Sequence, residues 1–308
     1  MATAPAQRPA PAITIEFDRP TRIRAAIIAL AFIAVFYNVL LDLKYHWYNS
    51  ADWSHGWLIP FFSAYLVYSH WDRVRLAPLR HTWVGLAVMV GALLGYQWFL
   101  WGLPMKYPQQ AMMLLCLLGV IIFLCGLPIV LRVWVPWLYL FFAIPLPQGV
   151  YYGLTDPLRR IAAVVTTNLL GLLPGLDIEK IGSTIHYTYQ GATGALGVAD
   201  ACSGMRSTMT LCALGVAVTF ISDRPWWQRV IMVAACVPIA VFSNLIRVTA
   251  TCLLHIFVDP KYAAGTYHTL LGLVALLIAF GVFSGLGWLL SNLFVEEPGS
   301  DVAERRDA

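Results

Sequence analysis

The chain has 308 residues, of which 59% are hydrophobic and 12% are charged, and its formal net charge is +4. A mean hydropathy of +0.71 excludes a soluble domain of ordinary composition, and the modest charge excludes a strongly basic nucleic-acid surface. Apolar runs of roughly 20 residues, the length that crosses a hydrocarbon core of ~30 Å, recur along most of the chain. The composition therefore predicts an all-α polytopic membrane protein.

The apolar runs predict about eight transmembrane helices within residues 23–294. An arm rich in proline and alanine, residues 1–22, precedes them, and a tail, residues 295–308, follows them. No cleavable signal peptide is recognised, so we expect the first span to stay as an anchor. In chain order, the predicted spans are Ile23–Leu43, Gly56–Trp71, Trp83–Trp101, Gln110–Leu127, Val133–Pro147 (interrupted by Pro136), Met205–Ser222, Val230–Phe257 and Thr269–Phe294.

The distribution of basic residues favours an orientation with both termini in the cytoplasm. Most arginines then fall in segments that face the cytoplasm, as the positive-inside tendency requires. The long segment between the fifth and sixth spans, residues 149–201, would then form a cap on the outer side of the membrane. Its first part has apolar residues at helical spacing behind Arg159 and Arg160, and its second part alternates with period two. We expect an interfacial or re-entrant helix followed by short strands or a hairpin.

Three chemically reactive side chains are expected at one depth, close to the outer surface of the membrane. Cys202, in VADACSGMRS, lies at the outer start of the sixth span, and His268 lies where the eighth span re-enters the membrane. Arg247 lies about 26 Å along the seventh span from its cytoplasmic end. An arginine within a span usually faces the bundle interior or a wet cavity. Asn244, three residues earlier, shares the helix face of Arg247.

A thiol, an imidazole and a guanidinium at one depth are suited to acyl transfer through a thioester. Cysteine attacks as the thiolate, which a helix N-terminus or a cation such as Arg206 favours. His268 can accept the thiol proton and return it to a leaving amine. Arg247 can stabilise the oxyanion of a tetrahedral intermediate or hold the substrate carbonyl. Asp200 can orient a partner or raise the thiol pKa, and the sequence leaves both roles open.

Other interpretations of the same residues remain open. Cys202 can be a packed apolar residue or a metal ligand, although scattered histidines and the absence of close Cys/His spacing predict no metal site and no cofactor. Arg247 can pair with a carboxylate or with backbone carbonyls as a structural residue. Arg206 can activate the thiol, bind substrate or extend to lipid headgroups. His55, at the outer start of the second span, can bind substrate or shape the cavity.

Three other functional classes are also considered. A transporter or export accessory protein would bind an anionic substrate through Arg247, but it needs polar residues that continue to the cytoplasmic side, whereas the polar cluster stays in the outer part. A structural membrane scaffold would tolerate the loss of Cys202. A serine-dependent intramembrane protease would use Ser203, which lacks the flanking motif of such enzymes.

Several segments resemble the exosortase/archaeosortase family. They are ACSGMR, NLIR and YHTLLG, in that order at the ends of late spans, together with the upstream SHGWLIPFFSAYLVY and FFAIPLPQGVYYGLTDPLRRIAA. The likeness covers roughly residues 45–290, and His268 favours the bacterial exosortase branch because archaeal members tend to carry arginine there. The resemblance implies that Cys202, Arg247 and His268 form the catalytic set.

The resemblance also implies a substrate and a location. Membrane-anchored proteins would be recognised through a C-terminal sorting signal, made of a short motif such as Pro-Glu-Pro, a transmembrane helix and a basic tail. Cleavage would leave an acyl-enzyme, later resolved by an unknown acceptor, in systems that accompany exopolysaccharide production. The expected location is the bacterial cytoplasmic (inner) membrane, with the active site facing the periplasm or exterior and with no nucleic-acid partner.

Overall fold

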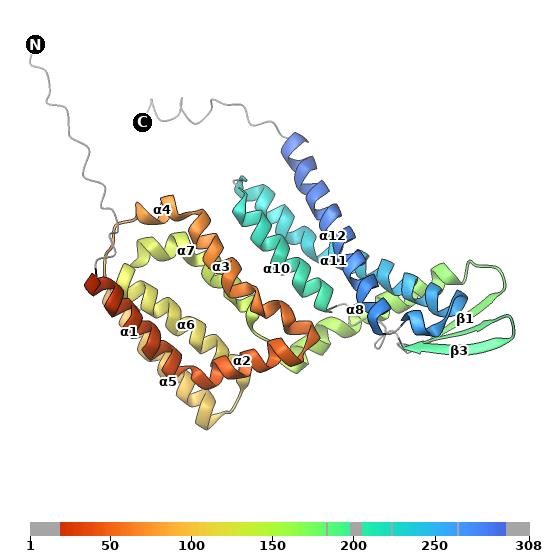
Figure 1. The fold of residues 1–308 in the computed structure, drawn as a ribbon, viewed down its shortest axis with the longest axis horizontal. Helices are drawn as coiled ribbons and strands as arrows, with labels where there is room; N and C mark the ends of the chain where they lie inside the picture. The colour runs from red at the N-terminus through yellow and green to blue at the C-terminus, as the bar shows by residue number, and fades with distance from the viewer. Residues whose placement is uncertain (1–18, 183, 198–204, 223, 264, 294–308) are drawn as a thin grey trace, which may run out of the picture. The chain divides into compact units, whose positions relative to one another are not determined.

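A computed structural model of the protein describes residues 19–182, 184–197, 205–222, 224–263 and 265–293 (Figure 1). Most of the N-terminal arm and the whole of the tail, residues 295–308, lie outside this set. The chain forms two compact units, Met1–Pro147 and Gln148–Ala308. Both units are mostly helical where they are described, in agreement with the predicted class.

The first unit consists of helices that follow its apolar runs. In chain order they are α1 (Arg19–Val35), α2 (Tyr37–Asn49), the 3-10 turn η1 (Ala51–Trp57), α3 (Ile59–Ser69), α4 (Trp71–Arg75), α5 (Trp83–Gln97), the π-helical turn η2 (Trp98–Gly102), α6 (Lys106–Cys125), α7 (Leu127–Tyr139) and the 3-10 turn η3 (Leu140–Ala143). Between α6 and α7, Gly126 has a φ of +86°, a conformation that disfavours a side chain and so ends the helix.

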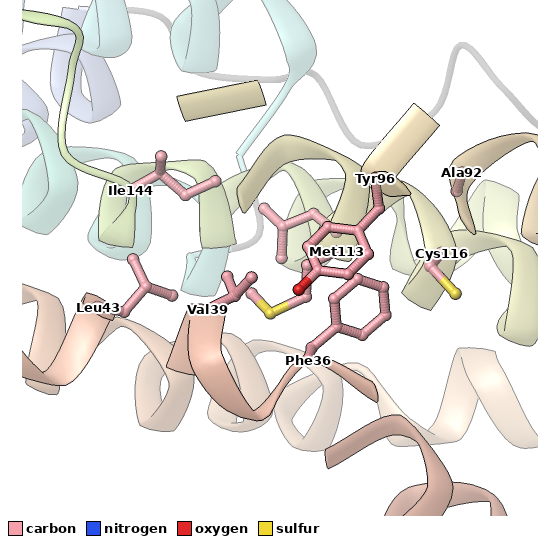
Figure 2. Close-up of a cluster of buried hydrophobic side chains, with 9 residues drawn as sticks. Phe36, Val39, Leu43, Ala92, Tyr96, Met113, Cys116 and Ile144 are labelled. Atoms are coloured by element: carbon pink, nitrogen blue, oxygen red, sulfur yellow. The ribbon is translucent and has the colours of Figure 1, made fainter. Parts of the chain in front are cut away.

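The core of the first unit lies where α2, α5 and α6 meet. Phe36 stacks edge-on against Tyr96, with ring centroids 5.0 Å apart, and Val39, Met113 and Ile144 pack around them (Figure 2). These side chains come from segments far apart in the sequence, and all are buried. Burial of such apolar surface is the main term that stabilises this unit outside the lipid contacts.

Glycines allow the closest helix contact of the first unit, between α5 and α6. A Cβ on Gly119 would lie 2.7 Å from Cγ of Met89 and 2.8 Å from its backbone nitrogen. A Cβ on Gly85 would lie 2.7 Å from the Gly119 carbonyl oxygen. Small residues at such positions let helix backbones approach closely in membranes. The α5–α6 pair therefore depends on both glycines.

We expect Gly119→Ala to destabilise the protein by about 1–3 kcal/mol, because the added methyl group overpacks the α5–α6 contact. The matched control is Gly91→Ala, on the same helix pair, where a Cβ meets nothing within 4 Å. That control should be neutral or slightly stabilising, because alanine favours helix over glycine. Thermal unfolding of the two purified variants in one detergent measures the difference, and equal midpoints would contradict the prediction.

The second unit combines long helices with a small sheet. Its elements are α8 (Gln148–Leu170), β1 (Leu176–Ile181), β2 (Thr184–Tyr189), β3 (Ala192–Gly197), α10 (Met205–Ile221), α11 (Trp226–Phe257), the 3-10 turn η4 (Pro260–Ala263) and α12 (Gly265–Leu293). The helices α10, α11 and α12 contact one another side by side (Figure 1). The strands form an antiparallel sheet in the order β1-β2-β3.

The sheet packs on α8 and α11 through one of its faces. Ile185, in the central strand β2, pairs with Lys180 on β1 and with Leu196 on β3. Ile185 is buried in a cluster with Ala163 of α8 and Val248 of α11. This arrangement confirms the predicted helix followed by short strands within the described part of residues 149–197, and it shows that the fold is not purely α.

Four helices of the described part are long and apolar enough to cross a membrane, namely Trp83–Gly102, Lys106–Cys125, Trp226–Phe257 and Thr269–Leu293. They correspond to the predicted third, fourth, seventh and eighth spans. The number rises to six if two broken helix pairs, Arg22–Val35 with Tyr37–Asn49 and Leu127–Ala143 with Gln148–Leu170, each count as one span. These pairs correspond to the predicted first and fifth spans, so the described residues contain four to six candidate spans where the sequence predicted about eight.

The predicted second and sixth spans are too short to be counted. In place of the second span, α3 has 11 residues, or ~16 Å of helix, against a hydrocarbon core of ~30 Å. In place of the sixth, α10 has 17 residues, or ~26 Å. The predicted first span bends by 71° between Val35 and Tyr37. Apolar composition identified these segments, but their helical lengths and directions do not follow from it.

Candidate functional site

The described part of the predicted site lies in the second unit, around the contact of α10, α11 and α12. Cys202 and Asp200 fall within residues 198–204, which lie outside the described residues. The helix α10 begins at Met205, three residues after Cys202 in the sequence. The described part of the site is therefore formed by the helices that follow the cysteine.

Arg247 of α11 lies near the end of this contact at which α10 and α12 begin. Its side chain is buried, with 8% of the residue exposed. Its Nη1 donates a hydrogen bond to Oγ of Ser207 on α10, at 3.3 Å. On the α12 side, the guanidinium lies against Gly272, where a Cβ would be 3.4 Å from Cζ of Arg247. The arginine thus faces the interior of the helix group, as expected for a cation in a span.

The backbone of His268 lies near the same place along α12. His268 is in the first turn of α12, which begins at Gly265, and Gly272 follows four residues later. Residues at this spacing are neighbours on a helix surface, about 6 Å apart along the axis. The turn that carries His268 is therefore adjacent to the turn that contacts Arg247.

Asn244 lies one turn before Arg247 and borders a small cavity. The residue is buried, and its Oδ1 accepts no hydrogen bond within the described ranges. Together with Thr208 and apolar side chains of α8 and α11, it lines a cavity of about 20 Å³. This volume is enough for about one water molecule, which would satisfy the amide oxygen. Asn244 therefore adds a polar position beside Arg247.

The first turn of α10 presents its polar residues in two directions. Arg206 is exposed, whereas Ser207 is half-buried against Arg247 and Thr208 is buried. Sequence reasoning selected Arg206 for its charge and missed Ser207 and Thr208. The available signal was weak: two small hydroxyl residues directly after an arginine, at the start of an apolar run.

His55 has a different setting, in the first unit. Its Nε2 lies 3.2 Å from the carbonyl oxygen of Phe142, which can only accept, so Nε2 is the donor. Nearby, Nε1 of Trp47 donates to the carbonyl of Ala143 at 2.8 Å, and Gly56 leaves the space that the Trp47 indole fills. Burial lowers the pKa of His55 from its usual value. These contacts tie η1 to η3 and favour a structural role for His55 over substrate binding.

The described residues contain no group of three His, Cys, Asp or Glu side chains that could hold a metal ion. The five cysteines within the described ranges, which are Cys116, Cys125, Cys212, Cys236 and Cys252, are all free thiols, and three of them are buried.

A comparison with protein-family models matches residues 47–285 to a family described as transmembrane exosortase. The matched range contains Cys202, Arg247 and His268, and it covers most of both compact units. Searches of curated proteins and of solved structures found no match.

Proposed function

Because the chain belongs to the transmembrane exosortase family, we propose that it is a cysteine-dependent peptidase and transpeptidase of the cytoplasmic membrane. Its proposed substrates are exported proteins that end in a sorting signal of the PEP-CTERM kind: a short motif, a transmembrane helix and a basic tail. The observation that carries this proposal is the buried Arg247, held by Ser207 of α10 and packed on Gly272 of α12.

In the proposed reaction, the Cys202 thiolate attacks the scissile carbonyl carbon and forms a tetrahedral intermediate. The guanidinium of Arg247 donates to the resulting oxyanion. The C–N bond then breaks, and His268, which took the thiol proton, returns that proton to the leaving amine. A thioester remains on Cys202, and water or an acceptor nucleophile attacks it to release the product and the thiol.

The chemistry of Arg247 supports its part in this proposal. A guanidinium carries five N–H donors in a fixed plane and stays protonated. Ser207 accepts from Nη1 and thereby orients the guanidinium plane. Burial among three helices lowers the local dielectric and strengthens such a hydrogen bond. Because three residues of chain span at most about 11 Å, Cys202 cannot lie farther than that from Met205, the first residue of α10.

The proposed orientation has both termini in the cytoplasm and the reactive residues near the outer surface, since most arginines lie in segments that would then face inward. A sorting motif just outside the substrate's own helix would reach a site at that depth. The transporter alternative is less well supported, because Gly272 packs on Arg247 and the cavity beside Asn244 has room for about one water molecule.

The test is co-expression of the full chain with a membrane reporter that ends in a Pro-Glu-Pro motif, an apolar helix and a basic tail. We expect mass spectrometry to find the reporter without its helix and tail. The matched control reporter carries Ala-Ala-Ala in place of the motif, with the helix and tail unchanged, and it should stay whole. Equal trimming of both reporters, or an intact reporter across a panel of short motifs, would contradict the proposed function.

Ser207 is expected to act as a positioning residue for Arg247. Ser207→Ala removes the acceptor at 3.3 Å from Nη1, so trimming should slow by about tenfold, the effect of one hydrogen bond to a charged group. Ser207→Thr keeps the hydroxyl and should restore most of the rate. Ser222→Ala, at the far end of the same helix group, is the control, because Ser222 bonds only the carbonyl of Val218. Equal rates for the alanine and threonine variants of Ser207 would contradict this role.

A further inference from the structure

We propose that the cap segment contains a phosphate-binding pocket, formed by Arg159, Arg160 and Lys180, that holds the headgroup phosphate of an anionic phospholipid. This pocket is separate from the residues of the proposed peptidase site and its occupancy does not depend on that activity.

The pocket lies between α8 and the turn that joins β1 to β2. It has a volume of about 460 Å³ and is lined by Asp156, Arg159, Arg160, Lys180 and Gly182. Gly182 has a φ of +65°, a conformation that favours glycine, and it lines the pocket together with Lys180 at the end of β1. The volume is within the range of about 300–1,000 Å³ that is typical of small-ligand sites.

The lining residues leave an excess of positive charge. Three cations face one carboxylate, and that carboxylate, Asp156, lies 3.3 Å from Nη1 of Arg159. The ammonium of Lys180 donates to the carbonyl oxygen of Gly182 at 3.2 Å, which uses one of its three donors. Arg160 is exposed. A net charge of about +2 in one pocket calls for an anion with more than one charged oxygen.

Arg159 is the best fixed of the three cations. Its side chain is only 17% exposed. Its Nε is buried and finds no hydrogen-bond acceptor in the part of the chain that the structure describes. A buried donor without an acceptor costs free energy, so Arg159 has unmet hydrogen-bonding capacity beside the pocket that it lines. The ion pair with Asp156 holds the guanidinium plane while other N–H groups remain available.

A phosphate monoester, with three terminal oxygens and a charge of about −1.5 to −2, suits this arrangement better than a single carboxylate. Arginine forks bind phosphate oxygens through two parallel hydrogen bonds, and lysine adds a point charge. Two arginines and one lysine can therefore each take a different oxygen of one phosphate group. A carboxylate has two oxygens and one charge, so it would leave part of the positive charge uncompensated.

The surroundings of the pocket favour a lipid as the source of that phosphate. On α8, Val164 is exposed and lies four residues from Arg160, so both are on one face of the helix. Basic groups beside exposed apolar side chains are typical of the boundary between headgroups and acyl chains. The chain is a multi-pass membrane protein, so phospholipid surrounds it.

The test is binding of phosphatidic acid, a phospholipid whose headgroup is a phosphate monoester, labelled with a fluorophore on one acyl chain, to the full-length protein in a neutral detergent. Fluorescence anisotropy gives the affinity of the wild type, of Arg160→Gln/Lys180→Gln and of a matched control. The control, Arg75→Gln/Lys261→Gln, removes one arginine and one lysine that are also exposed but lie elsewhere. We expect the pocket variant to bind at least about tenfold more weakly, since it loses two charge-assisted contacts, and the control to bind like the wild type.

Two further measurements test the role of charge and identify the ligand. Arg160→Lys keeps the charge and should retain most of the affinity. Inorganic phosphate and glycerol 3-phosphate are added as competitors: weak competition by either indicates the lipid as the ligand, and competition as strong as that of unlabelled lipid indicates free phosphate compounds in the same pocket. Affinity of the pocket variant equal to that of the wild type, or an equal loss in the control, would overturn the proposal.

Discussion

Cys202→Ala is expected to reduce trimming of the sorting-signal reporter by about a thousandfold or more, because it removes the proposed nucleophile, the thiol on which the thioester would form. The measurement is the fraction of trimmed reporter by mass spectrometry, together with a search for a reporter adduct on the protein. Wild-type protein should carry a small amount of thioester that hydroxylamine releases, and the alanine variant should carry none.

Two control variants make this result specific. Cys125→Ala removes a half-buried thiol at the end of α6 and should trim like the wild type. Ser203→Ala tests the neighbouring hydroxyl as the alternative nucleophile. Full activity of Cys202→Ala combined with loss of activity in Ser203→Ala would reverse the assignment. Full activity in both variants would mean that neither Cys202 nor Ser203 is the nucleophile and would contradict the proposed mechanism.

The sequence predicts well the helices that composition alone determines. Four spans are long apolar runs with few charges: Trp83–Gly102, Lys106–Cys125, Trp226–Phe257 and Thr269–Leu293. Because unpaired backbone polar groups are costly in lipid, such runs form helices. The period-two pattern between Leu176 and Gly197 likewise predicts short strands or a hairpin, and the structure has three strands there.

The breaks between helices are harder to predict because no residue type marks them. The bend of 71° after Val35 occurs at Val35, Phe36 and Tyr37, where neither proline nor glycine is present. In contrast, the strongly apolar α3 ends after 11 residues and is followed by the separate short helix α4. Packing of Phe36 against Tyr96 of α5 is a tertiary contact, and local sequence carries no sign of it.

The candidate site was predictable only in part for the same reason. An arginine in an apolar helix must find polar surroundings, so the inward direction of Arg247 follows from the energetics of the membrane. Its actual neighbours do not follow from those energetics. Ser207 is 40 residues away in sequence, and Gly272 has no polar group that would have drawn attention to it. His55 was predicted to bind substrate or to shape the cavity, and its hydrogen bond to Phe142 and its burial favour the second, structural role.

Arg247→Gln is expected to lower kcat for reporter trimming by about 10²–10³, the usual effect of removing an oxyanion donor. Glutamine keeps a hydrogen-bond donor but loses the charge and the planar fork. Arg247→Lys keeps the charge, yet its shorter point-charge head should not reach both Oγ of Ser207 and a substrate oxygen, so we expect only partial recovery. The matched control is Arg132→Gln, an exposed arginine of the first unit that contacts the carbonyl of Pro128.

The pattern of kinetic constants separates catalysis from binding. If Arg247 acts on the oxyanion, kcat falls in Arg247→Gln while KM for the reporter changes little, and the thioester on Cys202 does not accumulate, because acylation itself is slowed. If Arg247 only holds the ground-state carbonyl, KM rises and kcat is kept. If it is a strut between α10, α11 and α12, the thermal midpoint of Arg247→Gln falls and that of Arg132→Gln does not. A normal kcat in a folded Arg247→Gln protein would remove Arg247 from the proposed mechanism.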